Sequence, residues 1–180
     1  MILECGACRL RPWQLSDKPA LVKHANNPRI WRNLRDAFPH PYTDADAEAF
    51  IAGANSGPDW AYAIEVNGEA AGAIGIHPRQ DVERYSAEMG YWLGEAFWGR
   101  GLATAAVQTL SQYVLRNTEI FRIYAYVYAW NPASMRVLEK AGFGREAVLR
   151  RSVLKDGVVL DRVLYALTRD PGRPYQTIDY

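Results

Sequence analysis

The sequence predicts an α/β protein in which helices cover a mixed β-sheet. The chain has 180 residues, enough for about one domain, and we treat residues 1–180 as a single domain. Hydrophobic residues make up 49% and charged residues 23%, which are ordinary proportions for a soluble globular protein. Strand-like segments interleave with helical ones in the order β, α, α, α, β, β, β, α, β, α, β, β, which predicts a mixed sheet with helices packed on it.

The first third of the chain is predicted to contain one strand followed by three helical segments. Ser16 and Asp17 are favourable N-cap residue types for the first helix. The stretch from Thr43 to Asp46 supplies the start chemistry of the third helix. The expected elements are a strand over 9–13, a helix from Ser16 to about Asn26, an aromatic-bearing segment from Pro28, and a helix over 45–54.

The remainder of the chain alternates strands and helices. Asn67-Gly68 and Lys155-Asp156-Gly157 signal hairpins, because a tight type I′ turn needs positive φ at both central positions. Gly142 follows a short helical stretch and is a common helix terminator. The expected elements are strands over 60–66, 69–77, 86–93 and 123–129, helices over 101–116 and 131–141, and a final hairpin between Val148 and Leu167.

The charge balance limits the classes of partner. The chain carries 21 basic and 20 acidic side chains, and a net charge of +1 provides no global field that would attract nucleic acid. The two halves differ, because residues 1–90 carry a net charge of −3 and residues 91–180 a net charge of +4. We therefore expect no nucleic-acid partner, and we expect an anionic ligand to bind the second half.

The sequence also predicts a cytoplasmic protein without a membrane partner. No apolar run reaches the roughly 18 residues of a membrane helix, and the N-terminus lacks the features of a signal peptide. Cys5 and Cys8 form a C-x-x-C motif, but no second C-x-x-C or H-x-x-x-H completes a tetrahedral metal set. The pair precedes the first expected strand, whereas a redox motif occurs where a strand passes into a helix. We expect no metal, and the sequence assigns the pair no role.

The most informative stretch is Gly99-Arg100-Gly101-Leu102-Ala103-Thr104, which lies between a predicted strand and an amphipathic helix. The glycines let backbone N–H groups approach an anion, and the helix N-terminus adds unpaired donors and about half a positive charge. Pyrophosphate is a suitable ligand for such a loop. The stretch matches neither G-x-x-x-x-G-K-[ST] nor, because Thr104 takes the third glycine position, G-x-G-x-x-G. A glycine turn that only starts a helix is the structural alternative.

Three further segments accompany this loop: Glu88-Met89-Gly90-Tyr91-Trp92-Leu93-Gly94, Asn131-Pro132-Ala133-Ser134 and Glu139-Lys140-Ala141-Gly142-Phe143. Together with Phe38-Pro39-His40-Pro41-Tyr42-Thr43, they make the chain resemble the GNAT N-acetyltransferases over roughly residues 8–168. The resemblance is to the Rim-type branch, which includes N-terminal acetyltransferases of ribosomal proteins. It implies an acetyl-CoA-dependent fold whose splayed central sheet is covered by helices and opens in a V that admits the cofactor.

The resemblance implies specific contacts with acetyl-CoA. Backbone groups near Trp92 and Leu93 are expected to pair with the pantetheine amides, and the glycine-rich loop is expected to hold the pyrophosphate. Trp98 departs from the pattern, which has Gln or Arg there, and this weakens a side-chain contact but leaves the backbone cradle intact. The expected cofactor-binding residues are Trp92, Leu93, Gly99, Arg100, Gly101, Ala103, Thr104, Asn131 and Arg136.

Two residues are candidates for proton transfer. An alkyl amine must lose a proton before it attacks a thioester, and Glu88, on one strand face with Gly90 and Trp92, is the candidate base. By resemblance Ser134 is the candidate acid, because Leu138 stands where many relatives have a tyrosine that protonates the thiolate. The alternatives are an ion-paired or solvated glutamate and a serine that satisfies a backbone donor. The predicted cofactor-binding residues Asn131 and Arg136 also have structural alternatives. Asn131 can be the N-cap of a helix that begins with proline, and Arg136 can be a solvated charge on that helix.

The acceptor is expected to be a primary amine that attacks directly in a ternary complex, and the resemblance favours a protein or peptide N-terminus. Trp31, Phe38 and Tyr42 are expected to wall its groove, although aromatic residues of small domains more often build the core. A small-molecule N-acetyltransferase acting on a polyamine, amino sugar or antibiotic is an alternative, which the acidic side chains within residues 36–60 leave open. A non-catalytic acyl-CoA-binding module is another. The oligomeric state, including a homodimer, also stays open.

Overall fold

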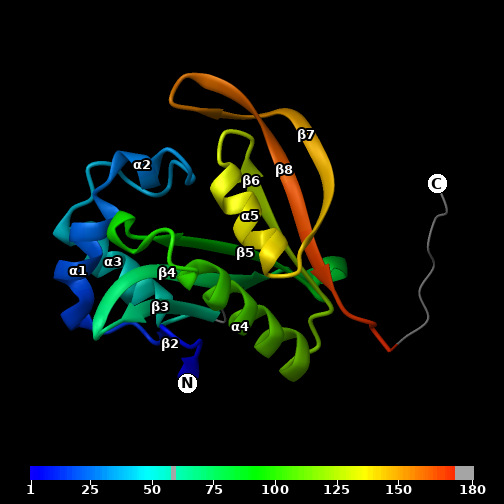
Figure 1. Cartoon of the computed structure of the whole chain (residues 1–180), viewed down its shortest axis with the longest axis horizontal. Coiled ribbons are helices and arrows are strands. Elements are labelled where there is room, and N and C mark those ends of the chain that lie inside the picture. The colour runs from blue at the N-terminus through cyan, green and yellow to red at the C-terminus, as the bar shows by residue number, and fades with distance from the viewer. Residues whose placement is uncertain (58–59, 173–180) are drawn as a thin grey trace.

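The structure, a computed structural model, describes residues 1–57 and 60–172 (Figure 1). The strands are β1 (Leu3–Glu4), β2 (Arg9–Arg11), β3 (Trp60–Val66), β4 (Glu69–Pro78), β5 (Ser86–Leu93), β6 (Arg122–Tyr128), β7 (Gly144–Lys155) and β8 (Val158–Thr168). The helices are α1 (Lys18–Ala25), α2 (Pro28–Trp31), α3 (Asp44–Ala54), α4 (Leu102–Asn117) and α5 (Pro132–Lys140). Short 3-10 turns cover Leu15–Asp17, Asp81–Glu83 and Glu95–Phe97.

The sheet splits between two of its strands. The strands described form a sheet in the order β1-β2-β3-β4-β5-β6-β8-β7, in which β5 and β6 pair in parallel across the α4 connection. Their pairing ends at Glu88 and Tyr124, although β5 continues to Leu93 and β6 to Tyr128. Beyond that pair the two strands separate, and Figure 1 shows two arms that run in different directions. The predicted α/β fold with a splayed, helix-covered sheet is confirmed.

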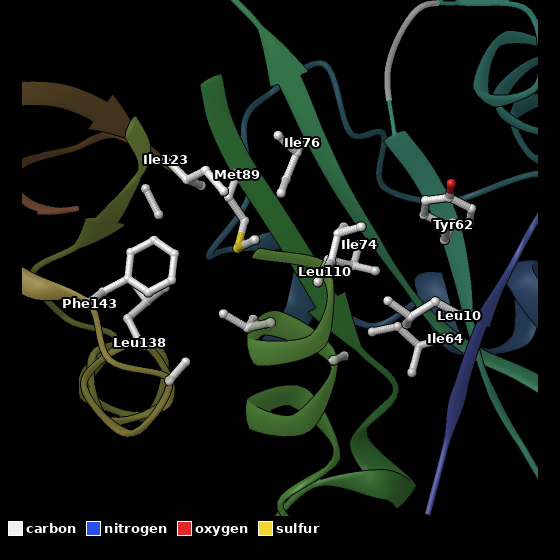
Figure 2. Packing of buried hydrophobic residues seen from close by; sticks show 14 of the residues in the cluster. Leu10, Tyr62, Ile64, Ile74, Ile76, Met89, Leu110, Ile123, Leu138 and Phe143 are labelled. Atoms are coloured by element: carbon white, nitrogen blue, oxygen red, sulfur yellow. The ribbon is translucent and has the colours of Figure 1, made fainter. Parts of the chain in front are cut away.

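Hydrophobic side chains pack on both faces of this sheet. The larger cluster fills the space between the sheet and α4 and α5, where Met89 and Leu110 approach each other (Figure 2). The smaller cluster includes residues of α1 and α3 together with Trp92. Alternation along β5 therefore directs Met89 and Tyr91 toward α4 and α5, and Glu88 and Trp92 toward the opposite face.

The N-terminal region departs from the prediction. The strand expected over 9–13 ends at Arg11, because Pro12 has no N–H group to continue the ladder, and the unpredicted strand β1 pairs with it. Asp17 does not cap α1 with its side chain. Its carboxylate instead accepts hydrogen bonds from Arg11 and from the Gln14 N–H group, which closes a 3-10 turn before the helix.

Both predicted hairpin turns are confirmed. Asn67 and Gly68 have φ values of 52° and 83°, and Asp156 and Gly157 have φ values of 51° and 72°. All four lie in the left-handed region that a type I′ turn requires. The last hairpin is longer than expected, since β7 begins at Gly144 and not at Val148, and its pairing with β8 contains two register shifts.

Cys5 and Cys8 flank the turn between β1 and β2. The Cys5 N–H group donates to the Cys8 carbonyl over 2.9 Å, and both thiols are free and buried. Within residues 1–57 and 60–172, no three His, Cys, Asp or Glu side chains gather as metal ligands would. No helix in those ranges is long and apolar enough to cross a membrane.

Candidate active site

The N-terminus of α4 presents backbone donors without a side-chain cap. Gly101 is its N-cap residue, and both Gly101 and Gly99 have φ near the left-handed region, at 75° and 74°. A Cβ atom at either glycine would meet no heavy atom within 4 Å, so the space beside the loop is open. The first helical turn, which contains Ala103 and Thr104, leaves N–H groups that no described side chain caps. The loop therefore has the conformation of an anion cradle.

The side chains around this loop tie it to the end of β5. The Trp98 indole N–H donates to the Leu93 carbonyl over 2.6 Å, so the residue that departs from the family pattern has a structural partner. Arg100 is exposed, and its guanidinium carbon lies 5.8 Å from the centre of the Phe97 ring. Trp92 is buried in the smaller cluster.

Gly90 exposes the backbone of β5 where the sheet splits. It lies two residues beyond the last pair with β6, and it is exposed although Met89 beside it is buried. A Cβ atom at Gly90 would meet no heavy atom within 4 Å. Because Gly90 shares a face with Glu88, the space next to it is where an acceptor can approach this carboxylate.

The Glu88 carboxylate is held between two arginines. One oxygen accepts a hydrogen bond from Arg35, and the other accepts one from Arg79 Nη2 over 2.6 Å. The Glu88 side chain is 11% exposed, whereas the side chains of Arg35 and Arg79 are 70% and 40% exposed. Glu88 is thus ion-paired with both guanidinium groups.

The Ser134 hydroxyl meets a tyrosine that sequence reasoning missed. Tyr91 Oη lies 2.7 Å from Ser134 Oγ and 3.2 Å from the Ser134 carbonyl oxygen. Burial raises the pKa of the Tyr91 phenol, so the phenol stays protonated at neutral pH. Strand alternation, which directs Tyr91 to the face of β5 opposite Glu88, was the sequence signal that could have identified this tyrosine. Leu138 is fully buried in the larger cluster and offers no proton.

Asn131 and Arg136 have structural positions on α5. The Asn131 side chain accepts a hydrogen bond from the Ser134 N–H group over 3.2 Å, which confirms it as the N-cap residue of the helix. Arg136 is exposed on the same helix. The N-cap fixes the backbone of Ser134 and so helps to hold its hydroxyl next to Tyr91.

The three predicted acceptor-groove aromatics have different surroundings. Tyr42 is buried, and burial raises its pKa to about 12. The Phe38 ring packs 5.0 Å from the Tyr42 ring and 5.8 Å from the Trp92 ring, and Phe38 and Tyr42 also line a pocket of about 340 Å³. The Trp31 ring lies 3.9 Å from the ammonium of Lys155, outside that cluster. The structure brings Phe38 and Tyr42 together, whereas the Trp31 ring packs 5.6 Å from the His40 ring.

Residues 34–36, which we call the crossing segment, touch both arms of the split sheet. Sequence reasoning missed the role of Lys155, whose side chain is only 1% exposed and whose ammonium donates to Asp36 over 2.7 Å. The Lys155-Asp156-Gly157 turn motif does not indicate that Lys155 binds Asp36. The contacts are Arg35 with Glu88 on β5, the Leu34 carbonyl with the Tyr128 hydroxyl on β6, and Asp36 with Lys155 on β7.

Comparison with known proteins agrees with this geometry. Residues 8–144 match the family model of the acetyltransferase (GNAT) domain. The chain therefore belongs to the GNAT acetyltransferase family. Its relatives and structural neighbours, which include ribosomal-protein N-acetyltransferases and RimJ, confirm the Rim-type branch of that family.

Individual relatives cover the chain to different extents. YjcK of Bacillus subtilis, named as a probable N-acetyltransferase, is 40% identical over 82 residues, which are 46% of this chain and 45% of the relative. The [ribosomal protein uS5]-alanine N-acetyltransferase of Escherichia coli is 34% identical over 56% of this chain and 55% of its own. The chain thus spans about half the length of these curated relatives. RimJ of Mycobacterium smegmatis, solved in complex with a CoA disulfide, has a TM-score of 0.83 at 25% identity, covering 93% of this chain and 87% of that chain.

Proposed function

We propose that this chain is an acetyl-CoA-dependent N-acetyltransferase that acetylates the α-amine of a protein or peptide N-terminus. The observation that carries the proposal is the opening between β5 and β6, with Glu88 on one face of β5 and the Tyr91–Ser134 pair on the other. Bound acetyl-CoA would supply the acetyl thioester that the amine attacks. The residues around the opening would bind the two substrates and move the protons.

The residues present fit CoA at two places. The uncapped N-terminus of α4 and the bare backbone at Gly99 and Gly101 suit the pyrophosphate. From Gly90 to Leu93, β5 has no paired residue on β6 in the described part of the chain, so its backbone groups can bind the pantetheine amides. The CoA disulfide in the RimJ structure supports this assignment.

Ser134 is the proton donor for the leaving thiolate in this proposal. The single proton of Tyr91 can go to the Ser134 carbonyl or to Ser134 Oγ. When Tyr91 donates to Oγ, the hydroxyl proton of Ser134 is left free to be donated into the opening. Tyr91 is therefore a positioning residue that acts through Ser134.

The arginines beside Glu88 favour an amine that is already easy to deprotonate. A guanidinium next to a bound amine disfavours the ammonium form, so Arg35 and Arg79 lower the pKa of that amine. An α-amine has a pKa of about 7.7–8.0, and a lysine-type amine one of about 10.4. At pH 7.5 roughly a third of the former but only about one in a thousand of the latter is neutral. Glu88 accepts the remaining proton once the acceptor displaces the exposed Arg35.

Two of the acidic side chains that left a polyamine acceptor open have close partners. Asp36 binds Lys155, and Asp46 caps α3 with Thr43. Asp44 and Glu48 each lie 3.9 Å from the same ammonium, that of Lys18, and Asp59 is outside the described residues. A polycation would meet arginines at Glu88, whereas a peptide can pair its backbone along an open strand. The name of the Escherichia coli relative, which specifies an alanine of a ribosomal protein, supports a peptide acceptor.

A competition assay tests this function. Short peptides with free N-termini, spermidine and an aminoglycoside are supplied at equal concentration with acetyl-CoA, and each kcat/KM is measured from product mass. We expect the peptides to be the preferred substrates. A small polyamine or amino sugar that exceeds every peptide by more than about a hundredfold, roughly 2.7 kcal/mol of transition-state preference, would contradict the peptide assignment.

Substitution at the cradle should remove cofactor binding. Gly101→Val places a branched side chain where the pyrophosphate would lie, so we expect acetyl-CoA binding to be lost in calorimetry. Because Gly101 has positive φ, valine there also strains the backbone. Gly68→Val is the matched control, since Gly68 has positive φ and open space but lies in the β3–β4 turn. A folded Gly101→Val protein with wild-type affinity would remove the cradle assignment.

A further inference from the structure

The sheet face that carries Glu88 also carries a row of tyrosines. Tyr124, Tyr126 and Tyr128 alternate along β6, and Tyr124 is the strand partner of Glu88, so all three side chains lie on its face. The rings of Tyr124 and Tyr126 meet edge to face with centres 5.6 Å apart. The row begins at the split of the sheet and continues along the arm that β6 and β8 form.

Several arginines lie over this row. The guanidinium carbon of Arg122 is 5.8 Å from the centre of the Tyr124 ring, but Arg122 is paired with Glu146, to which it donates over 2.8 and 2.6 Å. The guanidinium carbon of Arg79 is 5.6 Å from the centre of the Tyr124 ring, and Arg79 Nε donates to Tyr124 Oη over 2.5 Å. The guanidinium carbon of Arg162 is 4.4 Å from the centre of the Tyr126 ring. We call this surface the tyrosine–arginine face, and its members are Arg35, Arg79, Arg162, Tyr124, Tyr126 and Tyr128.

The arginines converge on the same opening from different elements. Arg162 on β8 is the strand partner of Tyr128, and Arg35 follows Leu34, whose carbonyl accepts a hydrogen bond from the Tyr128 hydroxyl over 3.4 Å. Burial raises the pKa of Tyr128, and the charges of Arg35 and Arg162 act to lower it. Arg35 belongs to the crossing segment, Arg162 to β8, and Arg79 follows β4. The Tyr126 ring and the Ser152 hydroxyl, which accepts a hydrogen bond from Arg162 Nε over 3.2 Å, hold Arg162 without neutralising it.

The nearby carboxylates leave this face with an excess of positive charge. Glu88 is shared between Arg35 and Arg79. The charge of Glu83 makes the smallest contribution to the raised pKa of Arg79. Asp36 also acts on Tyr128, but it is paired with Lys155. No carboxylate pairs with Arg162 within the residues that the structure describes.

We propose that the acceptor carries a carboxylate close to its reactive amine, and that Arg35 and Arg162 bind it. This inference rests on the proposed N-terminal acetyltransferase function and specifies its substrate class as peptides with an acidic residue near the N-terminus. Guanidinium groups recognise carboxylates through paired, charge-assisted hydrogen bonds, and these two are already oriented by their neighbours.

The proposal also explains how Glu88 becomes free to accept a proton. Arg35 is the more exposed of its two partners, and a substrate carboxylate can replace Glu88 as the partner of Arg35. Glu88 then retains Arg79 alone and faces the incoming amine. Since an extended peptide advances about 3.3 Å per residue, the acidic side chain belongs at the second or third residue of the acceptor.

Matched peptides test the proposal. Peptides that begin Ala-Glu, Ala-Gln and Ala-Lys but are otherwise identical are compared at low ionic strength, together with a peptide that carries Glu only at its sixth residue. We expect kcat/KM to be about tenfold higher for Ala-Glu than for Ala-Gln, mainly through a lower KM, and lowest for Ala-Lys. The Ala-Glu advantage should shrink as salt is added, because salt screens exposed charges.

Two variants locate the effect. Arg162→Glu should reverse the order so that Ala-Lys exceeds Ala-Glu, whereas Arg116→Ala, an exposed cation at the far end of α4, should leave the Ala-Glu to Ala-Gln ratio at the wild-type value. Peptides that are all acetylated at equal rates, or an advantage that persists in Arg162→Glu, would overturn the acidic preference and leave the N-terminal function standing. If no peptide is acetylated while a small amine is, the proposed function itself fails.

Discussion

Ser134→Ala should lower kcat by about 10² to 10⁴, which corresponds to roughly 3 to 5 kcal/mol of transition-state stabilisation. The reason is that, in the proposed mechanism, the variant removes the hydroxyl that Tyr91 contacts and that donates its proton to the thiolate. Acetyl-CoA affinity should change little, since Asn131 still caps α5 through the backbone N–H group of residue 134. Single-turnover kinetics and calorimetry separate the two effects.

Tyr91→Phe completes this test. It should lower kcat in the same direction, and the double variant should be no slower than Ser134→Ala alone, because Tyr91 acts through Ser134. Tyr113→Phe is the matched control, since it removes a hydroxyl from a half-buried tyrosine nearer the other end of α4. Additive losses in the double variant would mean that Tyr91 acts independently of Ser134, and a wild-type rate in Ser134→Ala would return Ser134 to a structural role.

Arg11→Met should destabilise the protein by about 3 to 5 kcal/mol at pH 7. The Arg11 guanidinium binds Asp17 over 2.7 Å and also binds Glu65, and all three side chains are less than 10% exposed. Without Arg11, two carboxylates stay buried with too few partners. Arg9→Met is the matched control, because Arg9 binds the same Glu65 over 2.6 Å but is 44% exposed and should cost less than about 1 kcal/mol. Urea unfolding measures both.

The Arg11 effect should also depend on pH. Burial alone would raise the pKa of Asp17 and of Glu65, but the hydrogen bonds from Arg11 and their other donors outweigh burial and lower both pKa values. A lowered folded-state pKa stabilises the protein above the unfolded pKa of about 4, and this contribution is lost as pH falls through the folded value. The difference in unfolding free energy between wild type and Arg11→Met should therefore shrink below about pH 4. A constant difference from pH 7 to pH 3 would contradict the assignment.

The sequence was most informative where local chemistry determines the structure. The turn at Asn67-Gly68 requires only two residues that tolerate positive φ, and β5 occupies the predicted residues 86–93. The glycines of the cradle were likewise recognisable, because positive φ and a helix start are local properties. The Rim-type resemblance added the splayed sheet, which no periodicity in the chain indicates.

Contacts between distant segments could not be predicted in this way. Glu88 is bound by Arg35, which lies 53 residues earlier in the chain, and by Arg79. The sequence alone therefore could not decide between an ion-paired glutamate and a catalytic base. Lys155 was read as part of a turn, because nothing near it indicates that it is buried against Asp36, 119 residues away. Tyr91 was overlooked for the same reason, since its partner lies on a helix that folds back over β5.

The crossing segment has a mechanical consequence for the split sheet. Where β5 and β6 have stopped exchanging backbone hydrogen bonds, the spacing of the two arms no longer depends on the fixed repeat of a ladder. Three consecutive residues whose side chains and carbonyl reach β5, β6 and β7 bridge the arms there, beside the Arg79–Tyr124 and Tyr91–Ser134 contacts. Such a strut can be lengthened or shortened by single substitutions that leave every strand register intact. The width of the opening is therefore an adjustable dimension of this fold.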